Sequence, residues 1–481
     1  MAATVLDAPA RIVAVRTAAA VRTARRRPHG LVVLAITGLA AFGYVAFGYL
    51  KYRAGSDAGW DLAIFDEELR SYASFHLPRA TVKQYDYAND PGMMLLHDHF
   101  SPLLILLVPL YWIHATALNL VVAQGVLFAA AGPVIWFFAR RRLGATVAYL
   151  VLGVYLLYWP LQEALDFDFH EVAFAPLLTA LLIERIDARR WRHAAIAAGL
   201  LLLVKEDQGL VVCAAGLWIM KEGHRRIGAY FAAVGFTVFV ALNYVVIPAL
   251  GGSSLRYWTF VLGSNPRTAL DYLLTHPAQS FADVFDPATP KMETLFWLLA
   301  PLLLLCLRSW IGLLALPLIL VRFLETEPSY WSQLYHYNAF LAAILVMAAV
   351  DGAGKLRWRR GPLVWAVTAL TISVLILPRF PLWQLGSVDF RRISTQQRYV
   401  ASAAALIPAG SYVLVPATYE AELDGRLRPL ADDAIKFAPE WILTTDLAAE
   451  LVRLENYEGK IMKIPHYTVV ARVGPWEVAK A

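Results

Sequence analysis

The chain has 481 residues, of which 59% are hydrophobic and 17% are charged, and its formal net charge is +6. A soluble protein of this composition would expose large apolar patches, so we expect a polytopic α-helical membrane protein. Because the short basic clusters stand beside apolar runs, they indicate the cytoplasmic ends of membrane spans, and no nucleic-acid partner is expected. Both cysteines, Cys213 and Cys306, lie inside apolar runs, which argues against a structural disulfide or a cysteine metal cluster.

The first thirty residues are rich in arginine and alanine and end in "RTARRRPHG", directly before the apolar run 31–50. This arrangement resembles the start of a signal peptide, but no clear small-residue cleavage site follows the apolar run. We therefore predict a basic cytoplasmic N-terminus over residues 1–30 and a retained first span. This span opens a membrane domain that covers residues 31–379.

The remaining basic clusters, taken as cytoplasmic, set the topology of this domain. They are residues 139–144, 184–193, 221–226 and 354–361. Counting crossings between them places the first loop, residues 51–101, outside the membrane. The later predicted spans are 228–250, 295–307, 310–324, 339–351 and 362–378.

Two segments of the membrane domain do not fit simple spans. Residues 193–220 are expected to run outward, turn at Lys205-Glu206-Asp207 below the outer surface, and return. The apolar run 102–113 is short and contains two prolines, so we interpret it as an interfacial or partly inserted helix. The number of crossings between residues 102 and 139 stays open, and the total is about ten or eleven spans of about 20 residues each.

The pattern changes at about residue 380. The stretches "SYVLVP", "PEWILTTD" and "KIPHYTVVARV" are typical of strands, and "AAELVRLENYEG" is typical of a helix. We therefore predict a small α/β domain over residues 380–481. The same count of crossings places it outside the membrane, so the protein is predicted to be a multi-pass protein with its N-terminus inside.

The stretch "GWDLAIFDEELRSY", residues 59–72, holds four acidic residues at the edge of the first span. Its apolar positions 62, 65, 69 and 72 predict an amphipathic helix at the outer interface, with Asp61 and Glu68 on one edge. One interpretation is a solvated face with an Asp66–Arg70 pair, worth a few tenths of a kcal/mol. The other is that Asp66 or Asp61 is a general base at the mouth of a cavity.

Two further polar motifs fall on the same side of the membrane. In "HDHFS" the three residues His97, Asp98 and His99 suit either a divalent ion or hydrogen bonds to a substrate, although neighbouring side chains point in different directions. In "DFDFHE" the residues Asp166, Asp168 and His170 share a face if the segment is extended. If it begins a helix instead, Asp166 meets His170 four residues further on. For HDHFS, hydrogen bonds to a substrate or to the loop are preferred over a metal ion, and for DFDFHE the alternative is a loop solvated at the outer surface.

Lys205 follows an almost unbroken run of leucines and is expected to be buried. It either pairs with Glu206 or Asp207, or it meets an anion such as a phosphate. Arg256, Arg322 and His336 are expected outside and would complete an anion pocket. The aromatic residues of "YWSQLYHYN" suit an interfacial belt better than a platform for a sugar.

Five of these motifs occur together in a known order. They are "GWDLAIFDEEL", "HDHFSPLLILLVPLYWI", "FDFHEVAFAPLLTALL", "LLLLVKEDQGLVV" and "YHYNAFLAAIL". In this order, over roughly residues 30–350, the chain resembles a bacterial membrane-protein family named domain of unknown function 2079, which is grouped with the GT-C glycosyltransferases. The resemblance implies a GT-C-like fold in the cytoplasmic (inner) membrane.

The resemblance also implies a chemistry. GT-C enzymes use an acidic residue of the first external loop, which would place the base on Asp66 with Glu67 beside it, or on Asp61. The donor would be a sugar on a polyprenyl phosphate, and the acceptor a glycan, lipid or protein. Lys205, with Arg322 or Arg256, would neutralise the departing phosphate.

The same resemblance gives roles to the remaining polar residues. Asp166, Asp168 and His170 would bind the acceptor or a divalent cation, Mg²⁺ or Mn²⁺. The first loop lacks an Asp-x-Asp pattern, so no metal requirement is predicted. The alternatives are a transporter or flippase for a lipid-linked or polar solute, a non-catalytic envelope scaffold and a metal-dependent phosphatase.

Overall fold

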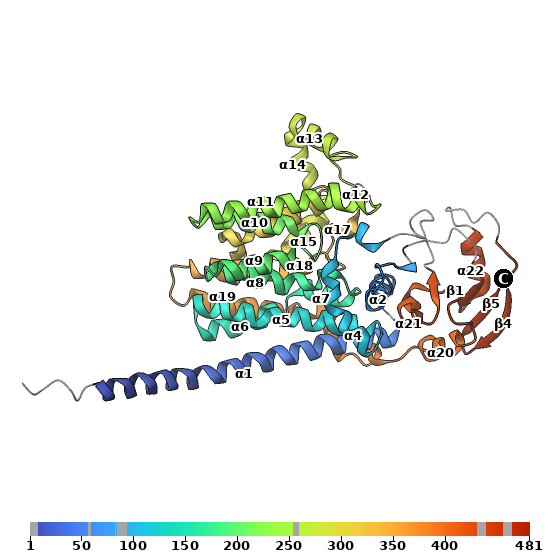
Figure 1. The fold of residues 1–481 in the computed structure, drawn as a ribbon, viewed down its shortest axis with the longest axis horizontal. Coiled ribbons are helices and arrows are strands. Elements are labelled where there is room, and N and C mark those ends of the chain that lie inside the picture. The colour runs from blue at the N-terminus through green and yellow to red at the C-terminus, as the bar shows by residue number, and fades with distance from the viewer. Residues whose placement is uncertain are drawn as a thin grey trace, which may run out of the picture.

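The computed structural model describes residues 8–55, 59–81, 83, 94–253, 259–430, 439–455 and 464–481. The chain forms a bundle of roughly parallel helices, with a small α/β domain beyond one end of the bundle (Figure 1). The helices up to the middle of the bundle are α1 Ala8–Ala54, α2 Trp60–Ala73, α4 Val108–Ile113, α5 Leu118–Leu143, α6 Ala145–Leu156, α7 Trp159–Asp166, α8 Ala175–Asp187, α9 Trp191–Leu201, α10 Gln208–Lys221 and α11 Arg225–Ala241. The later ones are α12 Ile247–Ala249, α13 Pro266–Thr275, α14 Pro277–Val284, α15 Ala288–Leu299, α16 Leu316–Phe323, α17 Pro328–Trp331, α18 Ala339–Gly354 and α19 Gly361–Leu375.

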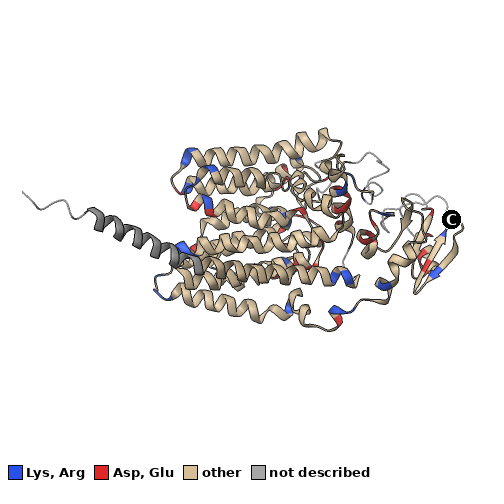
Figure 2. Ribbon diagram, turned by 60° about the horizontal axis from the view of Figure 1, so that its bottom comes forward, with Lys and Arg blue, Asp and Glu red and all other residues tan. Residues whose placement is uncertain are grey.

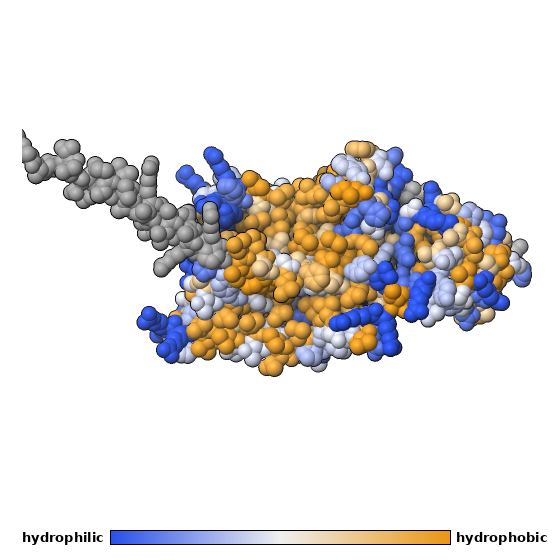
Figure 3. Space-filling view, turned by 90° about the horizontal axis from the view of Figure 1, so that it is seen from below, coloured by the Kyte–Doolittle hydropathy of each residue, from blue (hydrophilic) through white to orange (hydrophobic). Residues whose placement is uncertain are grey.

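Within the described residues, five helical segments are long and apolar enough to cross a membrane. They are His29–Ala54, Leu118–Leu143, Ala145–Asp166, Arg225–Ala249 and Gly361–Arg379. Three shorter apolar segments accompany them, Pro102–Ile113, Gln208–Lys221 and Ala339–Gly354. On the face shown in Figure 3, a broad apolar band covers the middle of the bundle, and hydrophilic residues gather beyond both of its edges. Such a surface is expected of a protein whose middle is surrounded by the hydrocarbon core of a membrane.

The basic clusters that were predicted to share one side of the membrane do share one end of the bundle (Figure 2). They are joined there by ion pairs between helices that are distant in the sequence. Arg141 of α5 pairs with Asp187 of α8 at 2.6 Å, and Arg142 reaches both Asp187 and Asp351 of α18. The polar motifs of the sequence lie toward the other end.

Several predicted spans are broken. The turn at Lys205-Glu206-Asp207 is found between α9 and α10, as expected. The predicted spans 295–307 and 310–324 are wrong as continuous helices, because α15 ends at Leu299 and only short helical pieces follow before α16. Leu303 and Leu304 both have positive φ, a conformation that an α-helix cannot contain. The ten or eleven spans predicted from the sequence therefore include interrupted ones.

The C-terminal α/β domain is built on one five-stranded sheet. Its strands are β1 Tyr412–Leu414, β2 Arg428–Leu430, β3 Trp441–Thr444, β4 Thr468–Val473 and β5 Trp476–Lys480, and its helices are α20 Thr395–Ala404, α21 Glu420–Leu423 and α22 Leu447–Glu455. The strand order is β2-β1-β3-β5-β4, parallel for the first three strands and antiparallel for the rest. The predicted strands and helix are found, while β2 and β5 are additional; both contain charged residues, Arg428 in β2 and Glu477 and Lys480 in β5.

Helix α2 lies between the bundle and the C-terminal domain, packed against α4 on one side and α21 on the other (Figure 1). Gly59, just before α2, has φ +76°, and a Cβ there would lie 1.9 Å from the carbonyl oxygen of Ala417. Only glycine allows this close approach. At the other end of α2, the Arg70 side chain lies against Gly425. The first external helix is therefore held by the C-terminal domain.

Replacing Gly59 by alanine tests this docking. We expect Gly59→Ala to lower the stability by the roughly 1–2 kcal/mol of a positive φ plus the additional cost of displacing the Ala417 backbone. Gly410→Ala is the matched control, because Gly410 has φ +79° with open space around it. Thermal unfolding in detergent should show a larger loss for Gly59→Ala than for Gly410→Ala. Equal losses would contradict a close contact at this position.

Candidate functional site

Helix α2 presents its acidic residues to different surroundings. Asp61 and Glu68 line a polar cavity at the end of the bundle remote from the basic clusters. Asp66 lies about 140° around the helix from Asp61, since an α-helix has about 3.6 residues per turn. It is fully buried, accepts a hydrogen bond from Arg70 at 2.7 Å, and accepts another from the Tyr111 hydroxyl at 2.6 Å. The Asp66–Arg70 pair anticipated from the sequence is present, and Asp66 does not line this cavity.

The polar cavity has a volume of about 220 Å³. It is closed by side chains from α2, from the segment before α4, from the segment after α7 and from the loop between α17 and α18. Its lining consists of Trp60, Asp61, Ile64, Phe65, Glu68, Lys83, Leu95, Asp98, His99, Ser101, His170, Tyr330, His336 and Tyr337. Four of the motifs singled out in the sequence thus converge on one chamber.

Glu68 is the buried acid of this cavity, with a side chain that is 1% exposed. Burial, reinforced by the negative charges of Glu171 and Asp98, raises the pKa of the Glu68 carboxyl well above its usual range. Its Oε1 is buried and has no hydrogen-bond partner among the described residues. This shift favours the protonated carboxyl, which can donate a hydrogen bond to an oxygen atom of a ligand in the cavity.

A buried ionic network forms the wall beside Glu68. Lys205 Nζ lies 2.8 Å from Glu171 Oε1, and the other carboxylate oxygen of Glu171 contacts His170 Nδ1. Burial alone would raise the pKa of Glu171, but His170 and Lys205 hold it well below its usual range. Lys205 was expected to pair with Glu206 or Asp207, and its ion-pair partner is instead Glu171 from the DFDFHE motif.

Two histidines complete this wall. The rings of His170 and His336 are stacked with centroids 3.6 Å apart. Burial, together with the neighbouring His170, lowers the pKa of His336 well below its usual range, so this ring is neutral at physiological pH. A neutral imidazole keeps one nitrogen as a donor and one as an acceptor. The wall can therefore bind polar groups without adding another charge.

The three polar residues His97, Asp98 and His99 of the HDHFS motif contact three different partners. His97 Nδ1 lies 3.1 Å from the Leu250 carbonyl oxygen, Asp98 pairs with Lys83 at 2.7 Å, and His99 pairs with Glu206 at 2.9 Å. In the part of the chain that the structure describes, no three His, Cys, Asp or Glu side chains are arranged to hold a metal ion. The motif thus builds the cavity wall and does not form a common set of Mg²⁺ or Mn²⁺ ligands.

The two aspartates of the DFDFHE motif are not among the cavity-lining residues. Asp168 Oδ2 accepts a hydrogen bond from the Leu62 amide at 3.4 Å, so it caps the first turn of α2. Asp166 pairs with Lys51 of α1 at 3.5 Å. The shared face predicted for Asp166, Asp168 and His170 is not found, because Asp166 ends helix α7 and the chain turns after it. Both acids position α2 and α1 and are not among the cavity-lining residues.

A second, more apolar chamber of about 230 Å³ adjoins the polar cavity. The two share Asp98, His99, His170, Tyr330, His336 and Tyr337. The apolar part of the second chamber is lined by Leu210, Phe239, Tyr244, Ile247, Phe260, Val321 and Phe340. Helix α11 leads into a short π-helical segment, Leu242–Val246, beside this chamber, and such segments are frequent at functional sites.

Arg322 lies in the wall of the second chamber, together with Lys205. Its guanidinium donates to the carbonyl oxygen of Tyr337 and to Asn338 Oδ1. The Nε of Arg322 is buried and has no hydrogen-bond partner among the described residues. An unpaired donor on a buried cation favours an anion at this position. Arg256, the other predicted anion-binding arginine, lies outside the described residues.

The sequence analysis missed part of the site. Glu68 was placed on the same edge as Asp61 but given no role, although its position seven residues after Asp61 puts it two turns along the same face. Glu171, Trp60 and Lys83 were not considered. Tyr330 and Tyr337 were expected in an interfacial belt, and they line the cavity instead.

Together, the bundle, the polar cavity beside α2 and the C-terminal α/β domain define a polytopic membrane protein with the fold of GT-C glycosyltransferases. The sequence profile of the predicted membrane protein family DUF2079 matches residues 56–417. The chain belongs to this family. No curated protein matches the sequence. The crystal structure of ArnT from Cupriavidus metallidurans bound to undecaprenyl phosphate is similar to this chain, with a TM-score of 0.51, 14% identity, and coverage of 93% of this chain and 97% of that one.

Removing one partner of the Lys205–Glu171 pair should be costly. We expect Lys205→Met to destabilise the protein by about 3–5 kcal/mol, because it leaves a buried carboxylate without its cation. The double variant Lys205→Met with Glu171→Gln should recover part of this loss. Thermal unfolding in detergent would measure the stability of each variant. A double variant whose loss equals the sum of the two single losses would show that the two side chains are not coupled.

The raised pKa of Glu68 predicts a pH dependence of stability. Above the usual carboxyl pKa the unfolded chain releases this proton while the folded protein keeps it, so stability falls as pH rises, by up to about 1.4 kcal/mol per pH unit. Glu68→Gln keeps a neutral side chain of the same shape and should remove this slope. The measurement is the unfolding midpoint from pH 5 to pH 9. A wild-type profile matched by the variant would contradict a protonated Glu68.

Proposed function

We propose that this protein is an inverting glycosyltransferase that moves a sugar from a polyprenyl-phosphate carrier to an acceptor of the bacterial cell envelope. The observation that carries the proposal is the pair of connected chambers, one polar, the other largely apolar with Arg322 and Lys205 beside several carboxylates in its wall. A lipid-linked sugar likewise has a polar sugar, a negatively charged phosphate and an apolar lipid chain. The fold shared with ArnT, whose structure contains undecaprenyl phosphate, supports a carrier of this kind.

In this proposal the apolar chamber holds the lipid end of the donor. The phosphate lies beside Arg322 and Lys205, where the buried Arg322 Nε is available to donate a hydrogen bond. The sugar extends into the polar cavity toward α2. Tyr330 and Tyr337 line both chambers, with ring centroids 4.8 Å apart, and offer apolar faces to a sugar ring.

Asp61 is the general base in this scheme, because it lines the cavity and is not fully buried. It takes the proton from an acceptor hydroxyl as that oxygen attacks the anomeric carbon. The bond from the anomeric carbon to the phosphate oxygen breaks, and the carrier phosphate leaves with one further negative charge. Arg322 and Lys205 stabilise that charge, and the neutral Glu68 donates a hydrogen bond to the sugar.

The basic end of the bundle supports a location in the cytoplasmic membrane, with that end and the N-terminus inside. The cavity and the C-terminal domain would then face outward, where a polyprenyl-linked donor is used and a glycan, lipid or protein acceptor is available. Residues 31–379 and 380–481 would thus act as a membrane domain and an external domain.

The base is tested by comparing two substitutions on the same helix. We expect Asp61→Asn to lower the rate of sugar transfer by about 10²–10⁴-fold, because it removes the group that accepts the proton. Asp66→Asn is the matched control and should act mainly on stability. The assay is release of polyprenyl phosphate from synthetic polyprenyl-phosphate sugars by purified protein. Activity that survives Asp61→Asn and is lost in Asp66→Asn would move the base to Asp66.

A further inference from the structure

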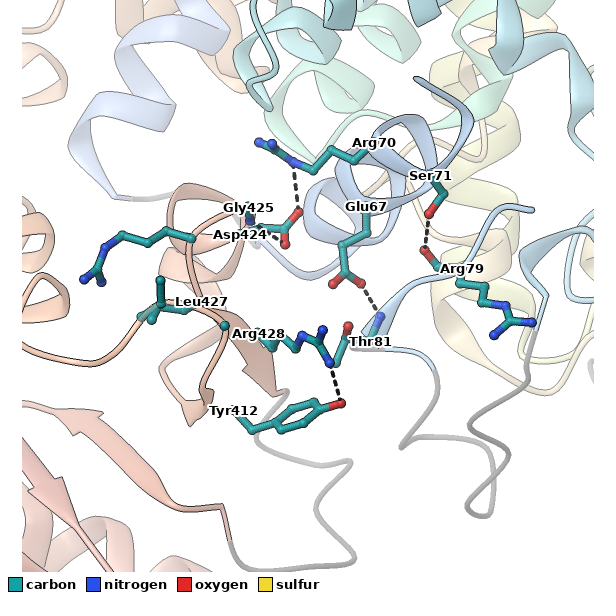
Figure 4. A pocket seen from close by; sticks show the side chains of 13 residues that line it. Glu67, Arg70, Ser71, Arg79, Thr81, Tyr412, Asp424, Gly425, Leu427 and Arg428 are labelled. Carbon is teal, nitrogen blue, oxygen red and sulfur yellow. Dashed lines mark hydrogen bonds and ion pairs between the residues drawn. The ribbon is translucent and has the colours of Figure 1, made fainter. Parts of the chain in front are cut away.

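A third space, distinct from the polar cavity and the apolar chamber, lies against another face of α2. It is a groove of about 970 Å³ between α2, the segment that follows it, and the C-terminal domain. Its lining consists of Glu67, Arg70, Ser71, Arg79, Thr81, Ala409, Gly410, Tyr412, Asp424, Gly425, Arg426, Leu427 and Arg428 (Figure 4). The proposed transfer reaction uses none of these residues.

The groove has an excess of positive charge. Of its four arginines only Arg70 is ion-paired among the described residues, with Asp66 at 2.7 Å and Asp424 at 3.4 Å. Arg79, Arg426 and Arg428 face no carboxylate within ion-pair distance in the described part of the chain. The groove has two acids of its own, of which Asp424 belongs to the Arg70 pair and Glu67 accepts a hydrogen bond from the Thr81 amide. The lining therefore carries more unbalanced guanidinium groups than carboxylates.

Two of these arginines are held in place by neutral partners. Arg426 donates to three carbonyl oxygens at the end of α20, those of Ala404, Ala405 and Ile407. Arg428 Nη1 lies 3.1 Å from the Tyr412 hydroxyl, and in Figure 4 its side chain extends from β2 into the space below Glu67. Guanidinium groups that are oriented without being neutralised bind phosphate oxygens at a lower cost in side-chain entropy.

The groove also adjoins the polar cavity. Thr81 lines the groove, and Lys83, two residues further along, lines the cavity and pairs with Asp98. On the other side only the thickness of α2, about 10 Å, separates the two spaces. Because α2 stands between them, a molecule held in the groove reaches Asp61 only if it passes around an end of α2.

We infer that this groove is a binding site for a phosphate group on the acceptor. The acceptor is then an extended anionic molecule, with its phosphate in the groove and its reacting hydroxyl roughly 10 Å or more away, beyond α2. The assignment as acceptor rests on the proposed function, whereas anion binding in the groove does not. The phosphate belongs to a lipid headgroup or to a soluble phosphorylated compound.

The test is a binding measurement with purified full-length protein and no donor. The probes are dihexanoyl phosphatidic acid, inorganic phosphate, and dihexanoylglycerol as the uncharged comparison. We expect phosphatidic acid or phosphate to bind, with affinity that decreases as salt increases, and each of Arg79→Gln and Arg428→Gln to weaken binding about tenfold. Arg398→Gln is the matched control, because Arg398 is an exposed arginine of the same domain that does not line the groove.

Binding of phosphatidic acid alone would identify a lipid headgroup, and equal binding of inorganic phosphate would identify a site for any phosphate group. Equal affinity for dihexanoylglycerol, no binding of either charged probe, or unchanged binding in both groove variants would overturn the inference. Asp61→Asn should bind the probes like the wild type. Intact anion binding in a protein without transfer activity would overturn the proposed function alone.

Discussion

The buried ion pair between Lys205 and Glu171 is the interaction on which the polar cavity depends. Each charge would be unstable alone at this depth, since moving an unpaired ion out of water costs several kcal/mol. Together with His170 they form an ion-paired cluster beside Glu68, whose pKa is raised by burial and by the negative charges of Glu171 and Asp98. The cavity thus contains many ionisable side chains. Because several of them are paired with one another, a ligand would meet mainly hydrogen-bonding groups.

Helix α2 divides the outer end of the molecule into two spaces. One face carries Asp61 and Glu68 to the polar cavity, while another carries Glu67 and Arg70 to the groove. The helix is held from below by Asp168 and from outside by the C-terminal domain at Gly59. Movement of the outer domain would therefore shift the acids of the cavity, and the two spaces are mechanically connected through one helix of fourteen residues.

Asp424, which lines the groove, lies in the same cluster of charged side chains as Asp66 and Arg70. Burial and the nearby carboxylates of Glu67 and Asp66 raise the pKa of Asp424 well above its usual range. Two carboxyl groups, Asp66 and Asp424, thus share the single cation Arg70. Because Asp66 is bound in this cluster, it stabilises the position of α2, and this is why the proposed function places the base on Asp61.

Much of the architecture followed from the sequence, because it depends on local properties. Apolar run length and the basic clusters gave the membrane class and the shared basic end, and the apolar spacing of residues 62, 65 and 69 gave helix α2 with its buried stripe. The break at Lys205-Glu206-Asp207 and most of the C-terminal elements were also predictable. The interruption at Leu303 and Leu304 was not, because an apolar run has the same composition whether or not its backbone is helical.

The sequence by itself determined which residues are polar within an apolar chain, and that their motifs meet at one end of it. Only the tertiary structure decided which of them meet one another. Glu206 and Asp207 directly follow Lys205, yet Lys205 pairs with Glu171, more than thirty residues earlier in the chain. Asp61 and Asp66 are separated by five positions and differ in surroundings because the C-terminal domain covers one side of α2 and the bundle covers the other. Such partners are set by packing between distant segments, which no local pattern encodes.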